Sequence, residues 1–469
     1  MVVFKIILDA HFNRIRKFAS MHQSHIFHRQ IHTHLPTAQR GDGAYIYDSS
    51  GKSYLDACGG AAVSCLGHSH PKVIDAIMQQ VRQMPYAHTA FFTNQPSELL
   101  AKFLTERAPE GIDHVYFVSG GSEAMESALK LARQYFVEKG QPERKKFISR
   151  KQSYHGNTLG ALAIGANKWR RQPFEDLLID VDHIDTCYAY RDQHKNESLE
   201  DYGLRVASQL EQRLQDVGAE NIIGFIAEPV VGATAGALVP APGYFKRIRE
   251  ICDDYDILLI LDEVMCGMGR TGSLFASEQE DICPDILVIA KGLAGGYQPL
   301  GAMLCSSDIY AAFADGSGLF QHGHTYVGHA TACAAGLAVQ QAIEEEGLLE
   351  NVNIMGEKLH VGLIERFFDH PHVGDIRGRG LFRAIELVAN RSTKAPFDPA
   401  AKIHALVKQN AMELGLACYP SGGTIDGLRG DHVLLAPPYL VNEKQVEEIV
   451  SKLGDAVDRA LINQPLRCE

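Results

Sequence analysis

The sequence lacks three features that would each indicate a particular class of protein: a surplus of basic residues, a long hydrophobic run and a paired-cysteine motif. Its 469 residues carry a formal net charge of -12, which argues against nucleic-acid binding because phosphate recognition needs basic surface. No apolar run reaches the roughly 18 residues that a membrane span requires. We therefore expect a soluble globular protein, and its hydrophobic content of 45% suffices to bury a sizeable core.

The ten cysteines are scattered without a CxxC pair, and many lie in apolar segments. This usage predicts buried, reduced thiols inside a cell and neither a disulfide framework nor a zinc site. The first residues carry more basic than acidic side chains, which faintly resembles a transit peptide, but serine and alanine are sparse there. We expect a cytoplasmic protein in which residues 1–20 are disordered or an extension before a start at Met21. Mitochondrial import is the alternative.

Two further motifs suggest ligands that the surrounding sequence does not support. Five histidines lie between residues 22 and 34, but no cysteine or carboxylate joins them, so we predict a polar entry segment and no metal site. The glycines at 267, 269 and 272 spell GxGxxG after a predicted strand. A dinucleotide site would need a helix to open directly from that turn, and the residues that follow have no amphipathic pattern.

Near-continuous apolar strands alternate with amphipathic helices from residue 114 to about residue 345. This alternation predicts an α/β fold whose mostly parallel sheet is covered by helices on both faces, with ligands at the carboxyl ends of the strands. A hairpin pattern at 43–57 and a helical pattern at 71–107 precede it, and a long loop is expected at 419–431. We expect an N-terminal segment (1–70) that packs with a smaller α+β C-terminal domain (346–469), and a large domain (71–345) between them.

Lys291 stands directly after the apolar run 286–289 and before a glycine-rich turn. Lysine is rarely buried without a partner. A lysine at the mouth of a core strand therefore either extends its amine to solvent or serves as a nucleophile, for example in a Schiff base. The other strand ends must decide between these interpretations.

Three of those strand ends also carry polar residues. SGGSEA (119–124) precedes a helix, so its backbone N–H groups and serine predict either a phosphate cup or an ordinary N-cap. Asp262 ends the apolar strand ILLILD, where it would either form a salt bridge or keep a pyridine nitrogen protonated. Tyr154 and His155 follow another strand, where the aromatic ring would either stack on a planar ligand or simply pack.

This order of features resembles that of the class III (ω-) aminotransferases, which are pyridoxal-phosphate enzymes of fold type I. The likeness runs from about residue 35 to residue 462. The stretches that carry it are YLDACGGAAVSCLGHSHP, SGGSEAMESALKLAR, SYHGNTLGA, AEPVVG, LILDEVMCGMGRTG, AKGLAGGYQPLGA, HGHTYVGHATACAAGLA, RGRGLF and APPYL.

The resemblance implies a role for each residue around the cofactor ring. Lys291 would hold pyridoxal phosphate as a Schiff base and then move a proton between the substrate carbon and the cofactor. Asp262 would pair with the pyridinium nitrogen, Val264 would press against one face of the ring and Tyr154 would stack on the other, with His155 beside it. A lysine with this role needs a lowered pKa, which burial beside a cationic cofactor would produce.

The resemblance also implies a phosphate site and a quaternary structure. Gly120, Gly121 and Ser122 would bind the phosphate, joined by Thr325 of the partner subunit. The family forms homodimers, in some cases dimers of dimers, with active sites at the interface. Glu228 lies where the family keeps an acidic residue near the substrate.

The substrate is less clearly indicated. Leu434 stands where ornithine-type members carry an arginine for an α-carboxylate, which weakens the case for such a substrate. Arg429 lies in the preceding loop, where amine:pyruvate members have a mobile arginine that binds the keto acid; a solvated loop arginine is the alternative. Ala62 replaces a tryptophan of several members and suggests a roomier pocket, and Tyr86 and Phe91 are candidate pocket residues.

We therefore predict an aminotransferase that moves an amino group from an amine or ω-amino acid to pyruvate or a similar keto acid by ping-pong kinetics. The expected partners are these small molecules and a second copy of the chain, with no nucleic acid, membrane or metal. The same scaffold also supports a lyase, a decarboxylase or a racemase, and a non-catalytic scaffold protein is a further alternative. The physiological donor, the acceptor and the stereopreference are not predicted.

Overall fold

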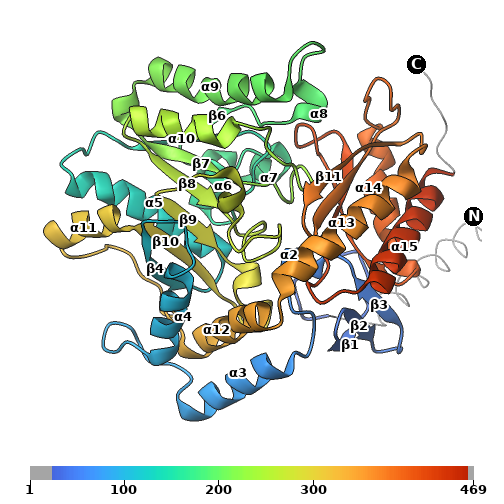
Figure 1. Cartoon of the computed structure of the whole chain (residues 1–469), viewed down its shortest axis with the longest axis horizontal. Helices are drawn as coiled ribbons and strands as arrows, with labels where there is room; N and C mark the ends of the chain where they lie inside the picture. Colours follow the sequence, from blue (N-terminus) through green and yellow to red (C-terminus); the bar gives the residue numbers. More distant parts are fainter. Residues whose placement is uncertain (1–23, 463–469) are drawn as a thin grey trace, which may run out of the picture.

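A seven-stranded sheet forms the centre of the protein, which we describe from a computed structural model over residues 24–462 (Figure 1). In spatial order its strands are β4 (Ile112–Val118), β10 (Gly301–Ser306), β9 (Ile286–Ile289), β8 (Leu258–Asp262), β7 (Ile222–Ala227), β5 (Lys146–Arg150) and β6 (Asp182–Ile184). Neighbours are parallel except where β10 pairs with β4 and β9. All strands but β10 therefore end at the same edge, which confirms the mostly parallel sheet.

Helices cover both faces of this sheet because the side chains of its central strands alternate between two apolar cores. In β8, Leu259 and Leu261 belong to one core, and Leu258 and Ile260 belong to the other. The first core includes residues of α4 (Gln95–Thr105), α9 (Leu199–Val217), α10 (Tyr244–Asp254) and α12 (Ala330–Glu345). The second includes residues of α5 (Gly121–Glu138), α6 (Leu159–Ile164) and α11 (Ser307–Asp315).

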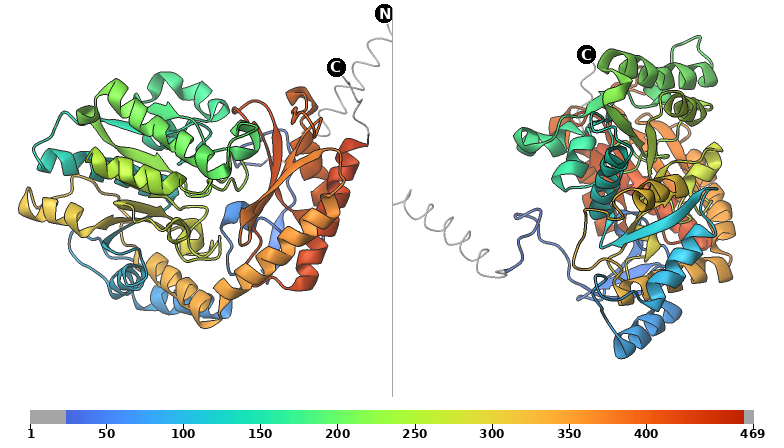
Figure 2. Two further views of the ribbon diagram at one scale, coloured as in Figure 1. Left: turned by 45° about the horizontal axis from the view of Figure 1, so that its top comes forward. Right: turned by 90° about the vertical axis from the view of Figure 1, so that its left-hand side faces the viewer.

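A second, antiparallel sheet lies to one side of the first (Figure 2). Its strands in spatial order are β11 (Val373–Arg379), β12 (Phe382–Leu387), β15 (Asp431–Leu435) and β14 (Tyr419–Gly422). The helices α13 (Leu348–Phe367), α14 (Ile403–Glu413) and α15 (Glu443–Leu461) share a third apolar core with it. Residues beyond about 346 thus form an antiparallel sheet with helices packed on it, and the apolar core of this part also includes residues of the N-terminal segment and of α12.

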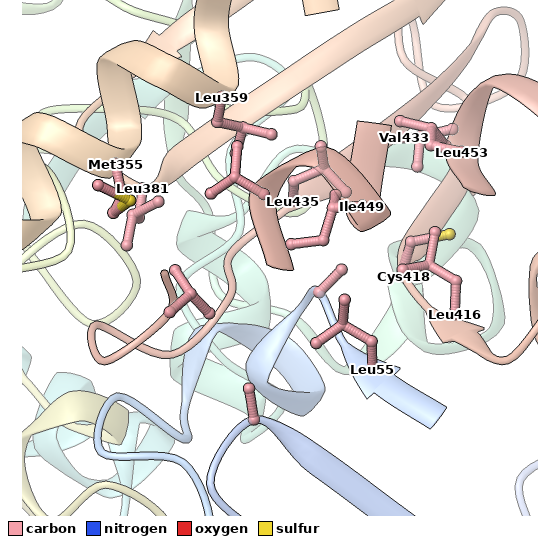
Figure 3. Close-up of a cluster of buried hydrophobic side chains, with 14 of the residues drawn as sticks. Leu55, Met355, Leu359, Leu381, Leu416, Cys418, Val433, Leu435, Ile449 and Leu453 are labelled. Carbon is pink, nitrogen blue, oxygen red and sulfur yellow. The ribbon is translucent and has the colours of Figure 1, made fainter. Parts of the chain in front are cut away.

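The N-terminal strands pack against this second unit. The predicted hairpin forms from β2 (Tyr45–Asp48) and β3 (Ser53–Asp56), flanked by β1 (Ala38–Asp42) and, parallel to β3, by β13 (Leu416–Ala417). Figure 3 shows Leu55 of β3 in the apolar cluster that also holds Leu416, Leu435 and Ile449. The boundaries at residues 70 and 345 stay a prediction.

Several elements differ from those expected. The helical pattern of 71–107 forms two helices, α3 (Pro71–Gln83) and α4, and the expected loop 419–431 begins with strand β14. Pro420 is tolerated there because β14 is an edge strand. Strand β6 and helices α9 and α13 were not predicted. No α-helix opens directly from the GxGxxG turn at 267–272, because the next element is a short 3-10 helix, η3 (Ala276–Glu280). The turn thus lacks the helix that a dinucleotide-binding motif needs.

Three further observations hold for residues 24–462. None of the helices is both long and apolar enough to span a membrane. All cysteines in this range are free, and no group of three or more histidine, cysteine or acidic side chains forms a metal-binding cluster. His22 and the predictions made for residues 1–20 lie outside the described residues.

Candidate active site

Five strand ends bring polar side chains to one cavity of about 350 Å³ at the carboxyl edge of the central sheet. Strand β4 leads to the SGGS turn, β5 to Tyr154, β7 to Glu228, β8 to Asp262 and β9 to Lys291. The residues that line the cavity are Val63, Ser119, Gly120, Gly121, Ser122, Tyr154, His155, Gly156, Glu228, Asp262, Val264, Met265, Ala290, Lys291, Gly296, Gln298, Pro299 and Leu300. The parallel topology explains this convergence, because the ends of parallel strands meet at one edge.

Lys291 begins the 3-10 turn η4 (Lys291–Leu293) with a φ angle of +47°, which is uncommon for a residue with a side chain. Such backbone conformations cluster at active sites, where the surrounding structure holds them. Burial lowers the pKa of Lys291 to about 8, although the carboxylates of Asp262 and Glu228 act in the opposite direction. A nucleophilic or basic amine needs such a lowered pKa.

The carboxylate of Asp262 is buried and fixed by two neighbours. Its Oδ2 lies 2.7 Å from Nδ1 of His155, and its Oδ1 accepts a hydrogen bond of 3.0 Å from the backbone N–H of Val264. The Nε2 atom of His155 is buried without a protein partner. The partner of Asp262 is thus a histidine. The alternative interpretation, a salt bridge to a lysine or arginine with no further role, would have required a different partner.

Glu228 supports the loop that carries Tyr154. Its Oε2 accepts a hydrogen bond of 3.3 Å from the backbone N–H of Tyr154, and its Oε1 accepts one of 3.0 Å from Gly232. Burial raises the pKa of this carboxyl group above its ordinary value. Glu228 therefore both lines the cavity and positions an aromatic residue of its wall.

The SGGS turn presents the N-terminus of α5 to the cavity. Gly120 precedes the helix in an extended conformation and makes no side-chain cap, and Ser122 lies within the first turn, where its Oγ accepts a hydrogen bond of 3.0 Å from the N–H of Asn157. A Cβ atom on Gly120 would meet nothing within 4 Å, whereas one on Gly121 would lie 3.0 Å from Cγ1 of Val264. Free N–H groups and the helix dipole at this point suit an anion.

Four of the predicted residues do not line this cavity in the single chain. Tyr86 donates a hydrogen bond of 2.8 Å to the carbonyl oxygen of Thr325, so these two residues are neighbours. The side chain of Phe91 is 79% exposed. Ala62 is buried beside Val63, which does line the cavity.

Arg429 is the fifth predicted residue outside the cavity lining. Its side chain is 59% exposed, and its Nε forms an ion pair of 2.8 Å with Asp426 in the same loop. Sequence analysis, in turn, missed Val63, Met265, Gln298 and Pro299 of the lining. Val63 and Met265 are next to predicted residues, and Gln298 lies two positions after Gly296 of the glycine-rich turn. This closeness in the chain is the only sequence feature that could have indicated them.

The cavity fits pyridoxal phosphate. An amine of lowered pKa and an oriented carboxylate lie at adjacent strand ends, and a glycine-lined helix N-terminus is open to the same space. These three groups suit a cofactor that has an aldehyde for the amine, a ring nitrogen for the carboxylate and a phosphate for the helix N-terminus. The fold and this cavity together define a pyridoxal-phosphate enzyme of fold type I.

Comparison with known proteins gives the family. The family model for class-III aminotransferases matches residues 26–457. An uncharacterized aminotransferase of Schizosaccharomyces pombe is 42% identical over 94% of this chain and 97% of its own, and a putrescine–pyruvate aminotransferase of Pseudomonas aeruginosa is 35% identical over 90% of each. The crystal structure of the omega transaminase from Pseudomonas jessenii in complex with PMP superimposes with a TM-score of 0.88, at 36% identity over 94% and 96% of the two chains.

The chain belongs to the class III aminotransferase family. It is a pyridoxal-phosphate-dependent aminotransferase, and PMP is the aminated form of that cofactor. The prediction of family, fold class, enzyme class and cofactor is therefore confirmed.

Proposed function

We propose that this aminotransferase transfers the amino group of an amine or ω-amino acid to pyruvate or a similar keto acid by ping-pong kinetics. The observation that carries the proposal is the convergence of Lys291, Asp262 and the N-terminus of α5 on one cavity. The similarity to a putrescine–pyruvate aminotransferase and to omega transaminases supports the substrate class. Leu434 in place of an α-carboxylate-binding arginine is consistent with it, because Leu434 is buried and apolar.

We propose the following residues for the cofactor. Asp262 would pair with the ring nitrogen, Tyr154 and Val264 would contact the two faces of the ring, and Gly120, Gly121 and Ser122 would bind the phosphate. When bound, pyridoxal phosphate supplies a carbonyl group that accepts the amino group and a protonated ring that withdraws electrons.

The chain's own groups would then orient the cofactor and move the proton. His155 keeps the Asp262 carboxylate in place through its bond of 2.7 Å. The Nζ atom of Lys291 would take a proton from the substrate carbon and return it, because its pKa of about 8 lies close to working pH.

A homodimer with active sites at the interface is part of the proposal. Phe91, Phe92 and Tyr326 are exposed by 79%, 65% and 58%, and Tyr86 bonds to Thr325 in the same region. Exposed aromatic groups of this kind are typical of protein interfaces. Thr325 and Phe91 would reach the active site of the partner subunit, with Tyr86 supporting them. We also propose a cytoplasmic location, which the free and mostly buried cysteines support.

A panel of donors and acceptors tests the function. Purified holoenzyme would be incubated with amines and ω-amino acids, each with pyruvate, with 2-oxoglutarate and without an acceptor, and the products would be identified. We expect the aminated keto acid as product, formed only when an acceptor is present. Release of ammonia, carbon dioxide or inverted substrate without an acceptor would instead assign a lyase, a decarboxylase or a racemase to the same cavity.

A further inference from the structure

An arginine that sequence analysis did not single out packs on Tyr154, which lines the cavity, although Arg170 is not itself one of the lining residues. Arg170 belongs to the short helix α7 (Lys168–Arg171), and its guanidinium carbon lies 4.4 Å from the centre of the Tyr154 ring, which lines the cavity. The same carbon lies 5.8 Å from the ring of Trp169. Two aromatic rings thus hold the guanidinium group, an arrangement that favours a cation but leaves its N–H edge available.

Arg170 differs from its neighbour Arg171 in having no polar partner for its guanidinium group among residues 24–462, whereas Arg171 pairs with Glu175. Within residues 24–462, no carboxylate lies within ion-pair distance of its guanidinium group, and only its backbone N–H forms a hydrogen bond, of 3.3 Å, to Asn167. Arg171 next to it is bound to Glu175 and to the carbonyl oxygens of Ala163 and Gly165. A half-buried guanidinium group without a counter-charge attracts a carboxylate, which it can bind with two parallel hydrogen bonds.

Two neighbouring segments keep Arg170 at this place. Gln152 bonds to Asn167 at the start of α7 at 3.3 Å, and it donates hydrogen bonds of 2.7 and 2.9 Å to the carbonyl oxygens of Gly423 and Thr424. The backbone of Gly427 packs so closely on Lys168 that a Cβ atom there would lie 2.8 Å from its amide nitrogen. Helix α7 and the loop 423–430 therefore form one wall, which is less free to move than an isolated surface helix.

The charges around this wall also favour an anion. Burial raises the pKa of the Tyr154 hydroxyl, and Tyr419 and Asp262 raise it further. Arg170 and Arg29 both act to lower this pKa. Burial likewise dominates the lowered pKa of Lys291, and Arg170 is among the groups that lower it further. Arg170 and Arg29 thus both act on the Tyr154 hydroxyl, whereas the two carboxylates of the cavity are held by other groups: Asp262 by His155, and Glu228 by the backbone N–H groups of Tyr154 and Gly232.

We propose that Arg170 binds the carboxylate at the far end of an ω-amino acid donor and so selects this donor class over simple amines. The assignment rests on the proposed function and narrows it. In an ω-amino acid the carboxylate is several bonds from the reacting amine, so its binding site must lie away from Lys291 at the cavity wall. Arg170 is then a specificity-determining residue, and Arg429, which already has Asp426 as its partner, is not needed for the donor.

A matched pair of donors tests this inference on the holoenzyme. 4-Aminobutanoate and butan-1-amine share a four-carbon chain, and only the first has a carboxylate. Each would be tested with pyruvate in steady state, and alone in the first half-reaction, where the change in cofactor absorbance reports the donor without the acceptor. Arg170→Ala should lower kcat/KM for 4-aminobutanoate about 10-fold to 100-fold, mainly through KM, since one charge-assisted contact is lost. The rate with butan-1-amine should fall far less, because this donor has no carboxylate whose contact is lost, so the ratio of the two kcat/KM values is the readout.

Three further variants separate the alternatives. Lys168→Ala removes an exposed charge from the same helix and should leave the ratio of the two donors unchanged. Arg170→Lys should recover only part of the lost selectivity, because lysine lacks the planar pair of N–H donors.

Equal losses with both donors in Arg170→Ala, no loss with either, or a selective loss in Arg429→Ala would each overturn the inference. Wild-type enzyme that aminates pyruvate from butan-1-amine but not from 4-aminobutanoate would overturn it too, with the proposed function intact. A wild-type enzyme that aminates no keto acid from any donor would contradict the proposed function itself.

Discussion

At the scale of single residues, the reactivity of Lys291 follows from where its amine is placed. Burial disfavours the charged form and lowers the pKa to about 8, and Asp262 and Glu228 keep it from falling further. The amine is therefore about half neutral near pH 8 and largely charged two units lower. Only the neutral amine has the lone pair that attacks a carbonyl group.

This pKa predicts how the apoenzyme takes up its cofactor. The rate at which apoenzyme binds pyridoxal phosphate covalently should rise with pH, reach half its maximum at about pH 8 and level off above it. Stopped-flow absorbance across pH 6 to pH 10, at roughly constant ionic strength, measures it. Lys291→Ala should show no covalent uptake and should lose transaminase activity by at least about 100-fold. A midpoint near the ordinary lysine value of 10.5 would contradict the assignment.

A second prediction concerns Asp262. Asp262→Asn removes the negative charge that would keep a ring nitrogen protonated, so kcat should fall roughly 100-fold or more. The amide can keep the contacts to His155 and Val264, so the thermal unfolding midpoint of the apoenzyme should change little. Asp180→Asn, at an exposed ion pair with Lys146, is the control. Near-wild-type kcat in the Asp262 variant would rule out the role proposed for this carboxylate.

At the scale of elements, a buried ionic cluster joins the antiparallel sheet of β11 and β12 to helix α8 and to the loop that follows β7. Glu386 of β12 is completely buried and binds Arg191 of helix α8 (Ala189–Asp192) at 2.8 Å and Arg377 of β11 at 2.7 Å, with the hydroxyl of Tyr188 as a third partner. Arg377 also donates to the carbonyl oxygens of Ala235 and Gly236. Burial alone would raise the pKa of Glu386, but the two arginines outweigh it, and the pKa is lowered.

Glu386→Gln should therefore destabilise the protein. It leaves the largely buried guanidinium group of Arg191 without its carboxylate, while Arg377 keeps Asp375 at 2.6 Å, so we expect a loss of about 3 kcal/mol in the free energy of unfolding. Urea titration at pH 7 measures the change. Glu443→Gln breaks the exposed pair with Lys358 and should cost less than about 1 kcal/mol. Similar values for the two variants would contradict the structural role of the cluster.

The sign of the pH dependence follows from the lowered pKa of Glu386. Its stabilising contribution is complete above its ordinary pKa of 4.5 and is lost as the pH falls through the lower value in the folded protein. The difference in stability between wild type and Glu386→Gln should thus be largest at neutral pH and shrink in acid. A difference that grows on acidification would show that the cluster is not held by this charge.

At the scale of the whole molecule, the exposed aromatic surface predicts a dimer. Sedimentation should give a species of two 51.6 kDa chains. Phe91→Asp should weaken the dimer, because the side chain is 79% exposed in the single chain and a buried charge would replace an apolar contact. Cofactor affinity should fall with it if Thr325 of the partner subunit contacts the phosphate.

A control variant tests whether that loss is specific. Phe368→Asp changes a side chain that is 66% exposed at the end of α13, far along the chain from the aromatic group at residues 86–92, and should leave the mass unchanged. A monomeric wild-type enzyme with full activity would contradict the interface proposal.

Much of the fold could be predicted from the sequence because its signals are local. The apolar strands β4, β5, β7, β8, β9 and β10 were all indicated by the length and continuity of their hydrophobic runs. Strand β14 was not, because its Tyr-Pro-Ser-Gly sequence becomes a strand only through pairing with β15. The candidate residues at strand ends were likewise indicated, since polar groups after apolar runs are visible without a structure.

The sequence by itself determined the family, the cofactor and the presence of apolar strands that end in Lys291, Asp262 and Tyr154, because each depends on residues close together in the chain. The tertiary structure alone decided that His155 is the partner of Asp262 and that Arg170 lies on Tyr154. These contacts join segments that meet only when strands β5 and β8 and helix α7 pack. Which side chains contact one another across these segments depends on that packing, and no local sequence pattern encodes it.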